Sequence, residues 1–149
     1  MKRFSLLLAL AMLAMLFGAC SSQATPPSTP QATTINTPDR VDIVYFYKSN
    51  PCACMQVVGD YIQQVVILNF QEQVDNGKLT LKMVISDTPD NAALVKKYNS
   101  PPFWLYITTV RGDTETVHSV PDIWGLTGDK DKLAAYLKNT IQKALEGKL

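Results

Sequence analysis

The distribution of apolar and polar residues divides the chain into three parts. Lys2 and Arg3 precede an apolar run at positions 4–17, which only Ser5 interrupts. Over residues 21–40, large apolar side chains almost disappear, and Ser, Thr, Gln, Ala and Pro take their place. From residue 41 onward, apolar positions recur with the periods of strands and helices. We therefore expect an N-terminal segment over 1–20, a linker over 21–40 and one folded domain over 41–149, which is close to the usual domain size.

The folded part shows strand and helix patterns in alternation. Residues 41–47 are apolar and aromatic except for Asp42, as in a strand buried on both faces, and we expect Asp42 itself at a solvated strand end. A helical apolar stripe then runs from Cys54 to about residue 74 and ends at Asn76-Gly77. The remaining expected elements are a strand over 79–85, a short helix over 91–98, strands over 103–110 and 116–120 joined as a hairpin, and a final helix from Asp129.

The first twenty residues have the order of an export signal: basic, then apolar, then small. Their apolar run is shorter than the roughly 20 residues that span a bilayer, so cleavage is favoured over a permanent membrane helix. Gly18-Ala19-Cys20 resembles the lipobox of bacterial lipoproteins, although Phe17 stands where that motif usually has Leu. The resemblance implies that Cys20 is acylated and anchors the protein to the extracytoplasmic side of a cell membrane, inner or outer. The alternative is a secreted protein cut before Cys20, with a free thiol.

Charge and motifs exclude several classes of function. The chain carries 14 basic and 13 acidic residues and has no basic stripe interleaved with aromatic residues, so nucleic acid is not an expected partner. No Gly-rich phosphate loop follows the first strand, so we expect neither a flavin nor a nicotinamide cofactor.

Two further cysteines, Cys52 and Cys54, lie between the first strand and the first helix. Unpaired amides and the positive end of the helix dipole favour the thiolate there. Disulfides persist outside the cytoplasm, but cysteines two residues apart can be bridged only in a bent backbone. Such a bridge would be strained and easily reduced, which suits thiol–disulfide exchange better than a structural role. The alternative is a pair of inert thiols.

A βαβ half followed by a ββα half, with cysteines after the first strand and a proline opening the third, resembles the thioredoxin fold. The resemblance implies an α/β domain with a central mixed four-stranded sheet. It also implies that Cys52 attacks a disulfide of an exported partner protein, that Cys54 resolves the mixed disulfide, and that a cis-proline faces them. We expect that proline to be Pro102, which directly precedes the third strand, in preference to Pro101.

The mature domain contains Val44-Tyr45-Phe46, Tyr61, Asn76-Gly77-Lys78-Leu79 and Ile123-Trp124-Gly125-Leu126-Thr127-Gly128-Asp129-Lys130. Through these residues it is further similar to the small ArsF-type family of presumed nitrophenyl-compound nitroreductase subunits. Members usually carry a Cys-x-x-Cys pair, whereas here Met55 occupies the second position and Cys54 comes one residue early. We therefore do not predict nitroreduction by this chain alone.

Two other functions remain open at this point. The sulfur atoms of Cys52, Cys54 and Met55 are soft ligands suited to Cu(I), so the loop could instead bind or deliver copper. The only histidine, His118, is expected on the hairpin as an exposed strand residue. Alternatively, the domain is a silent interaction module at the cell surface. We expect Trp104 and Trp124 to pack in the core, although Trp104 could also line a groove beside the cysteines.

Overall fold

A computed structural model describes residues 37–149, so Cys20, the expected signal and nearly all of the expected linker lie outside the described residues. Within residues 37–149, none of the helices combines the length and apolar character of a membrane span. The elements in chain order are β1 (Arg40–Tyr47), α1 (Ala53–Asp75), β2 (Leu79–Ile85), a 3₁₀ turn (Pro89–Asn91), α2 (Ala92–Tyr98), β3 (Trp104–Arg111), β4 (Thr114–Ser119), a second 3₁₀ turn (Pro121–Leu126) and α3 (Lys130–Leu145).

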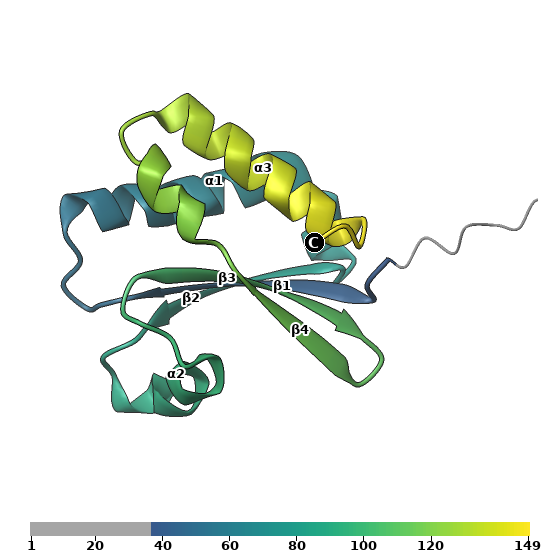
Figure 1. Ribbon diagram of the computed structural model, residues 1–149, viewed down its shortest axis with the longest axis horizontal. Helices are drawn as coiled ribbons and strands as arrows, with labels where there is room; N and C mark the ends of the chain where they lie inside the picture. The colour runs from purple at the N-terminus through teal and green to yellow at the C-terminus, as the bar shows by residue number, and fades with distance from the viewer. Residues whose placement is uncertain (1–36) are drawn as a thin grey trace, which may run out of the picture. The chain divides into compact units, whose positions relative to one another are not determined.

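The four strands form one mixed sheet in the order β2-β1-β3-β4. The β1 strand pairs parallel with β2 and antiparallel with β3, which in turn pairs antiparallel with β4. Helices α1 and α3 cover one face of this sheet, and the short helix α2 lies on the other face (Figure 1). This connectivity, βαβ followed by ββα, confirms the thioredoxin-like α/β fold.

The central strand β1 is buried on both faces, as its uninterrupted apolar sequence predicts. Its odd-numbered residues Val41, Ile43 and Tyr45 belong to the larger core, which α1 and α3 close. Val44 and Phe46 point to the opposite face and form a smaller core with Val84 and Tyr106 beneath α2. Because β1 contributes to both cores, the loop after Tyr47 follows a strand that is packed on both faces.

Both tryptophans pack against these cores, as expected. Trp124 contacts the larger core, and Trp104 contacts the smaller one while its indole Nε1 donates to Ser119 Oγ at 3.0 Å. His118 is half-buried on β4, opposite Ile107. It is therefore less exposed than the sequence suggested, whereas the other residues of β4 are exposed.

Asp42 corrects one expectation, because it is only 8% exposed instead of lying at a solvated strand end. Its carboxylate accepts hydrogen bonds from Arg40 Nε at 2.7 Å, Arg40 Nη2 at 3.1 Å and Thr80 Oγ1 at 2.6 Å. Burial by itself raises the pKa of Asp42, but the bonds from Arg40 and Thr80 outweigh it and hold the pKa below its usual value. Asp42 is buried because its strand is paired on both sides, with Thr80 of β2 and Thr108 of β3 as its neighbours.

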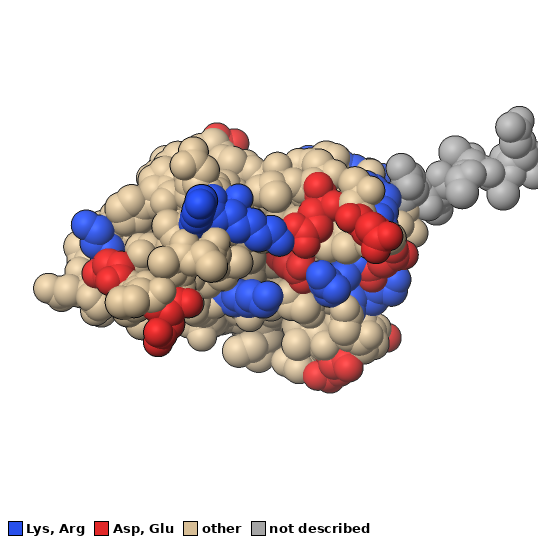
Figure 2. Space-filling view, turned by 90° about the horizontal axis from the view of Figure 1, so that it is seen from below, with Lys and Arg blue, Asp and Glu red and all other residues tan. Residues whose placement is uncertain are grey.

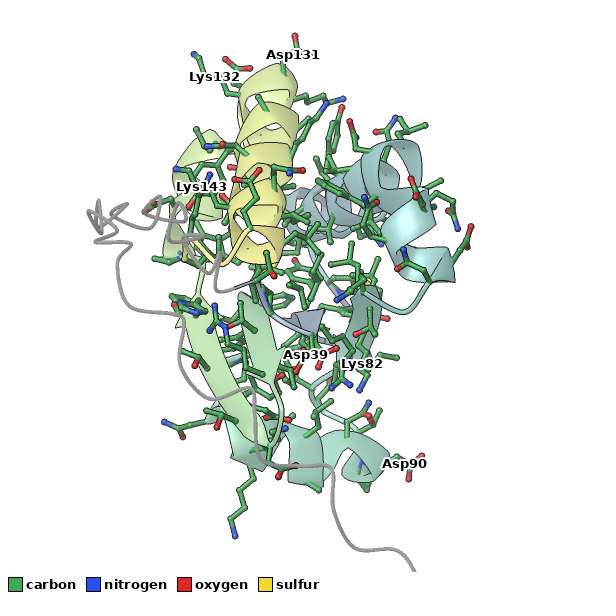
Figure 3. All side chains as sticks on the ribbon, turned by 90° about the vertical axis from the view of Figure 1, so that its right-hand side faces the viewer. Asp39, Lys82, Asp90, Asp131, Lys132 and Lys143 are labelled. Carbon is green, nitrogen blue, oxygen red and sulfur yellow. The ribbon has the colours of Figure 1, made fainter. Side chains whose placement is uncertain are left out.

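The surface charges have no single sign. Seen from the α2 side, acidic and basic side chains are interspersed (Figure 2). At the start of α3, Asp131 and Lys132 project away from the sheet (Figure 3), and Lys132 Nζ lies 2.8 Å from a carboxylate oxygen of Asp129. The charged side chains of α3 therefore lie on the solvated face of an amphipathic helix.

Candidate functional site

Cys52 and Cys54 lie at the N-terminus of α1, directly after the loop that leaves β1. Cys52 is the N-cap residue with an extended backbone (φ −69°, ψ 162°), and its carbonyl oxygen accepts from Met55 N at 3.0 Å and Gln56 N at 3.1 Å. Cys54 therefore belongs to the first helical turn, one residue earlier than in a Cys-x-x-Cys site. Both side chains are exposed free thiols, so each can be reached by a partner in solution.

The two thiols differ in acidity. A hydrogen bond from the Cys54 side chain, followed by one from the backbone of Met55, lowers the pKa of Cys52. The same thiol–thiolate contact raises the pKa of Cys54, and burial and the charge of Cys52 act in the same direction. Cys52 is thus the more acidic thiol of the pair, whereas the sequence led us to expect a favoured thiolate at both positions. A lowered pKa favours the thiolate, which is the form of a cysteine that attacks a disulfide.

Tyr45 lies beneath the cysteine turn and holds it to the sheet. This residue is 1% exposed, and its hydroxyl donates to the carbonyl oxygen of Met55 at 3.1 Å. Burial, and then the nearby charges of Cys52 and Cys54, raise the pKa of Tyr45 above its usual value. The tyrosine therefore stays neutral and acts as a hydrogen-bond donor to the turn that carries both thiols.

A second anchor connects the loop after β1 to the turn after β2. The backbone N and the Oγ of Ser49 donate to the two carboxylate oxygens of Asp87, each at 2.9 Å. The two bonds from Ser49 lower the pKa of Asp87, so this clamp is present whenever the carboxylate is ionised. Sequence reasoning missed both anchors, because the first depends on how α1 packs on β1 and the second on the pairing of β1 with β2.

The prolines lie at the same end of the sheet as the cysteines, but the expected cis bond is wrong. In the antiparallel pair of β1 and β3, Phe46 is opposite Trp104, so the residues just before β3 are near the loop after β1. No peptide bond within residues 37–149 is cis, and both Pro101 and Pro102 are exposed. The chain reverses instead through left-handed residues on either side of the prolines, Asn99 (φ 44°) and Phe103 (φ 68°).

A cavity of about 530 Å³ opens beside the cysteine turn. Pro51 and Met55, which flank the cysteines in sequence, both line it, together with Tyr45 and Tyr47 of β1 and Met83 of β2. The sequence contained two signals for this space: alternate tyrosines at the end of β1 and a glycine, Gly59, inside α1. A Cβ atom on Gly59 would lie 3.2 Å from Met83 Cε and 3.3 Å from Tyr45 Cε1, so any larger residue would crowd these two side chains.

The site offers few ligands for a metal ion. In the part of the chain that the structure describes, no three His, Cys, Asp or Glu side chains come together in a way that could hold one. His118 lies on β4, the edge strand on the β3 side of the sheet, whereas the cysteines follow β1. A copper site here would therefore consist of the two cysteines and Met55 alone.

Fold and site together define a thioredoxin-like α/β domain with an exposed dithiol at the start of its first helix. The solution structure of a thioredoxin from Thermus thermophilus is similar with a TM-score of 0.41 and 15% sequence identity, over 70% of this chain and 76% of that chain. The sequence matches no protein-family model and no curated protein. The fold assignment consequently follows from the strand order and connections of the chain itself, and the resemblance to the ArsF-type family stays a prediction.

Proposed function

We propose that this protein is a membrane-anchored thiol–disulfide exchange protein that acts on other exported proteins. The observation that carries the proposal is the exposed Cys52–Cys54 pair at the N-terminus of α1, with opposite pKa shifts on the two thiols. The expected export signal and acylated Cys20 support a location at the extracytoplasmic face of a cell membrane, where partner disulfides persist.

The exchange would proceed in two steps. The Cys52 thiolate attacks one sulfur of a partner disulfide, a mixed disulfide forms, and the partner's other sulfur leaves as a thiolate. Cys54 then loses its proton and attacks Cys52 Sγ, which closes a Cys52–Cys54 disulfide and releases the partner's second thiolate. The partner gains two electrons and the protein loses two. The same steps in reverse oxidise a partner dithiol.

The spacing of the cysteines affects the second step. Cys54 lies in the first turn of α1, and a disulfide requires Cα atoms about 4.4–6.8 Å apart with a specific torsion about the sulfurs. Residues i and i+2 meet this requirement only in a bent backbone, and here the chain bends at Cys52, the extended N-cap residue before the helix. A disulfide closed in so tight a ring would be strained and readily reduced, and the oxidised form would be a strong oxidant of partner thiols.

The test is the redox state and midpoint potential of the Cys52–Cys54 pair, obtained by thiol trapping in glutathione buffers. The whole sheet and both cores lie within residues 37–149, so a domain of residues 34–149 can be produced alone. A reversible disulfide with a potential of roughly −270 to −120 mV, the range of known exchange proteins, supports the proposal. Cys52→Ser and Cys54→Ser serve as controls, since neither can form the intramolecular bond.

One observation favours a second candidate, copper binding. Met55 is half-buried in the same helical turn as the exposed cysteines, so three soft sulfur ligands occur within four residues. Competition for Cu(I) between the reduced domain and a chelator of known affinity separates the two functions. Tight Cu(I) binding without a reversible disulfide supports the copper site, whereas the absence of both activities supports a non-catalytic interaction module.

A further inference from the structure

The cavity beside the cysteine turn has a defined construction. Tyr45 and Gly59 form its floor and are buried, while Tyr47, Met55 and Met83 form half-buried walls. The rings of Tyr45 and Tyr47 are stacked with centroids 6.0 Å apart and an interplanar angle of 12°. Flat aromatic surface next to flexible thioethers accommodates a long or planar side chain.

The rim of the cavity is polar and carries a single charge. Gln56, Asp60 and Gln63 are exposed on successive turns of α1, and Asp60 is the one charged side chain among the lining residues. Within residues 37–149, the ion pairs do not involve Asp60. Gln63 Nε2 donates to the carbonyl oxygen of Gly59 at 3.5 Å, which leaves Gln63 Oε1 as an acceptor.

We propose that this cavity binds an arginine or lysine side chain of the polypeptide whose cysteine is joined to Cys52. The aliphatic stem would lie against Met55 and Met83, and the cationic head would lie over the exposed part of the Tyr47 ring and within reach of the Asp60 carboxylate. An aromatic face and a carboxylate both attract a cation, and a guanidinium also stacks on a ring. The inference rests on the proposed exchange function and names the substrate class of that site.

The position of the cavity determines how many residues separate the basic side chain from the reacting cysteine in the partner sequence. Pro51 and Met55 both line it and bracket Cys52, so a chain held at Cys52 passes the cavity within a few residues. An extended chain advances about 3.3–3.6 Å per residue. The basic residue is therefore expected within three positions of the partner's reacting cysteine.

The experiment measures a competition at Cys52 in the Cys54→Ser variant, which cannot resolve a mixed disulfide. Cys52 is first converted to a mixed disulfide by reaction with the symmetric disulfide of a cysteine peptide that has citrulline two positions on either side of the cysteine, which releases one peptide thiol. This peptide and a second one with arginine in place of citrulline then compete as thiols for Cys52 until equilibrium. Citrulline has the shape of arginine without its charge. Mass spectrometry gives the ratio of the two mixed disulfides, and each exchange releases one peptide thiol for each one bound.

We expect the arginine peptide to be favoured about threefold at low salt, as an exposed ion pair allows. Asp60→Asn should reduce the ratio to about one, whereas Glu72→Gln, an equal change of charge about 18 Å farther along α1, should leave it unchanged. Both positions are exposed, so neither change threatens the fold. A ratio near one in the Cys54→Ser protein, or an arginine preference that survives Asp60→Asn, overturns the inference.

This competition does not depend on the proposed redox activity, because any accessible thiol forms mixed disulfides. If the wild-type domain forms no reversible Cys52–Cys54 disulfide but the arginine preference is present, exchange catalysis fails and the basic-residue pocket remains. If the disulfide forms but the preference is absent, the pocket fails and exchange catalysis remains. If neither peptide forms a mixed disulfide at Cys52, both fail.

Discussion

Gly59→Ala tests whether the floor of the cavity is as closely packed as the structure shows. Gly59 lies inside α1, where alanine is favoured over glycine by about 1 kcal/mol of helix propensity. Against this gain, the new Cβ would meet Met83 Cε at 3.2 Å and Tyr45 Cε1 at 3.3 Å. Relief of such crowding costs about 1–3 kcal/mol in a packed interior.

The two neighbours of Gly59 differ in how easily they move. Met83 presents the end of a flexible side chain and can rotate away. The ring of Tyr45 cannot shift freely, since its hydroxyl is bonded to the Met55 carbonyl and the residue is buried. We therefore place the crowding cost near 2 kcal/mol, in the middle of the usual range, and expect a net loss of about 1 kcal/mol in the free energy of unfolding.

Urea denaturation of the 34–149 domain measures this change when the midpoint and slope of the Gly59→Ala protein are compared with those of the wild type. Ala135→Gly provides the matched control, because Ala135 is exposed in the interior of α3 and reports helix propensity alone; it should destabilise by about 1 kcal/mol. If Gly59→Ala instead stabilises the domain by about the amount that Ala135→Gly destabilises it, no close contact exists at Gly59, and the described floor of the cavity is wrong.

The remaining predictions concern the pKa of Cys52, the buried carboxylate of Asp42 and the expected acyl anchor at Cys20. Cys54→Ala should raise the pKa of Cys52, because it removes the donor that lowers this pKa most. The rate of iodoacetamide alkylation of Cys52, measured against pH, should therefore shift to higher pH in Cys54→Ala and shift less in Cys54→Ser, which keeps a hydroxyl donor. Identical alkylation curves for the wild-type and Cys54→Ala proteins would contradict the contact between the two thiols. Asp42→Asn should destabilise the domain by about 2 kcal/mol near neutral pH, as loss of charged hydrogen bonds does. Because the folded pKa of Asp42 is lowered, its contribution is present above the unfolded pKa of about 4 and is lost as the pH falls through the folded value, so the two urea midpoints should converge only in acid. Cys20→Ser should move the protein from the membrane fraction to a soluble or processed form, and an unchanged distribution would argue against an acyl anchor.

The sequence by itself determined the elements and their order. Periodic apolar residues placed β1, α1, β2 and α3 within a few residues of their observed bounds, because burial of one helical stripe or strand face is a local property of the pattern. Turn signals were equally local: Gly77 and Gly112 both adopt positive φ, at 77° and 53°, where the sequence predicted a helix end and a hairpin. The position of Cys52 and Cys54 at the N-terminus of a helix followed from the same reasoning, but the opposite pKa shifts of the two cysteines did not, because the contact between the two side chains is their largest cause.

Only the tertiary structure decided what surrounds these thiols. Asp42 is buried since strands on both sides pair with it, and its partner Thr80 is 38 residues away along the chain. The turn before β3 uses Asn99 and Phe103 in left-handed conformations where a cis-proline was expected. The support of the cysteine turn by Tyr45, and the cavity beside it, depend on the register that sets Tyr45 next to Met83 beneath Gly59. Local periodicity specifies which face of an element is buried, but the identity of the atoms that meet there is fixed only when distant segments pair in register.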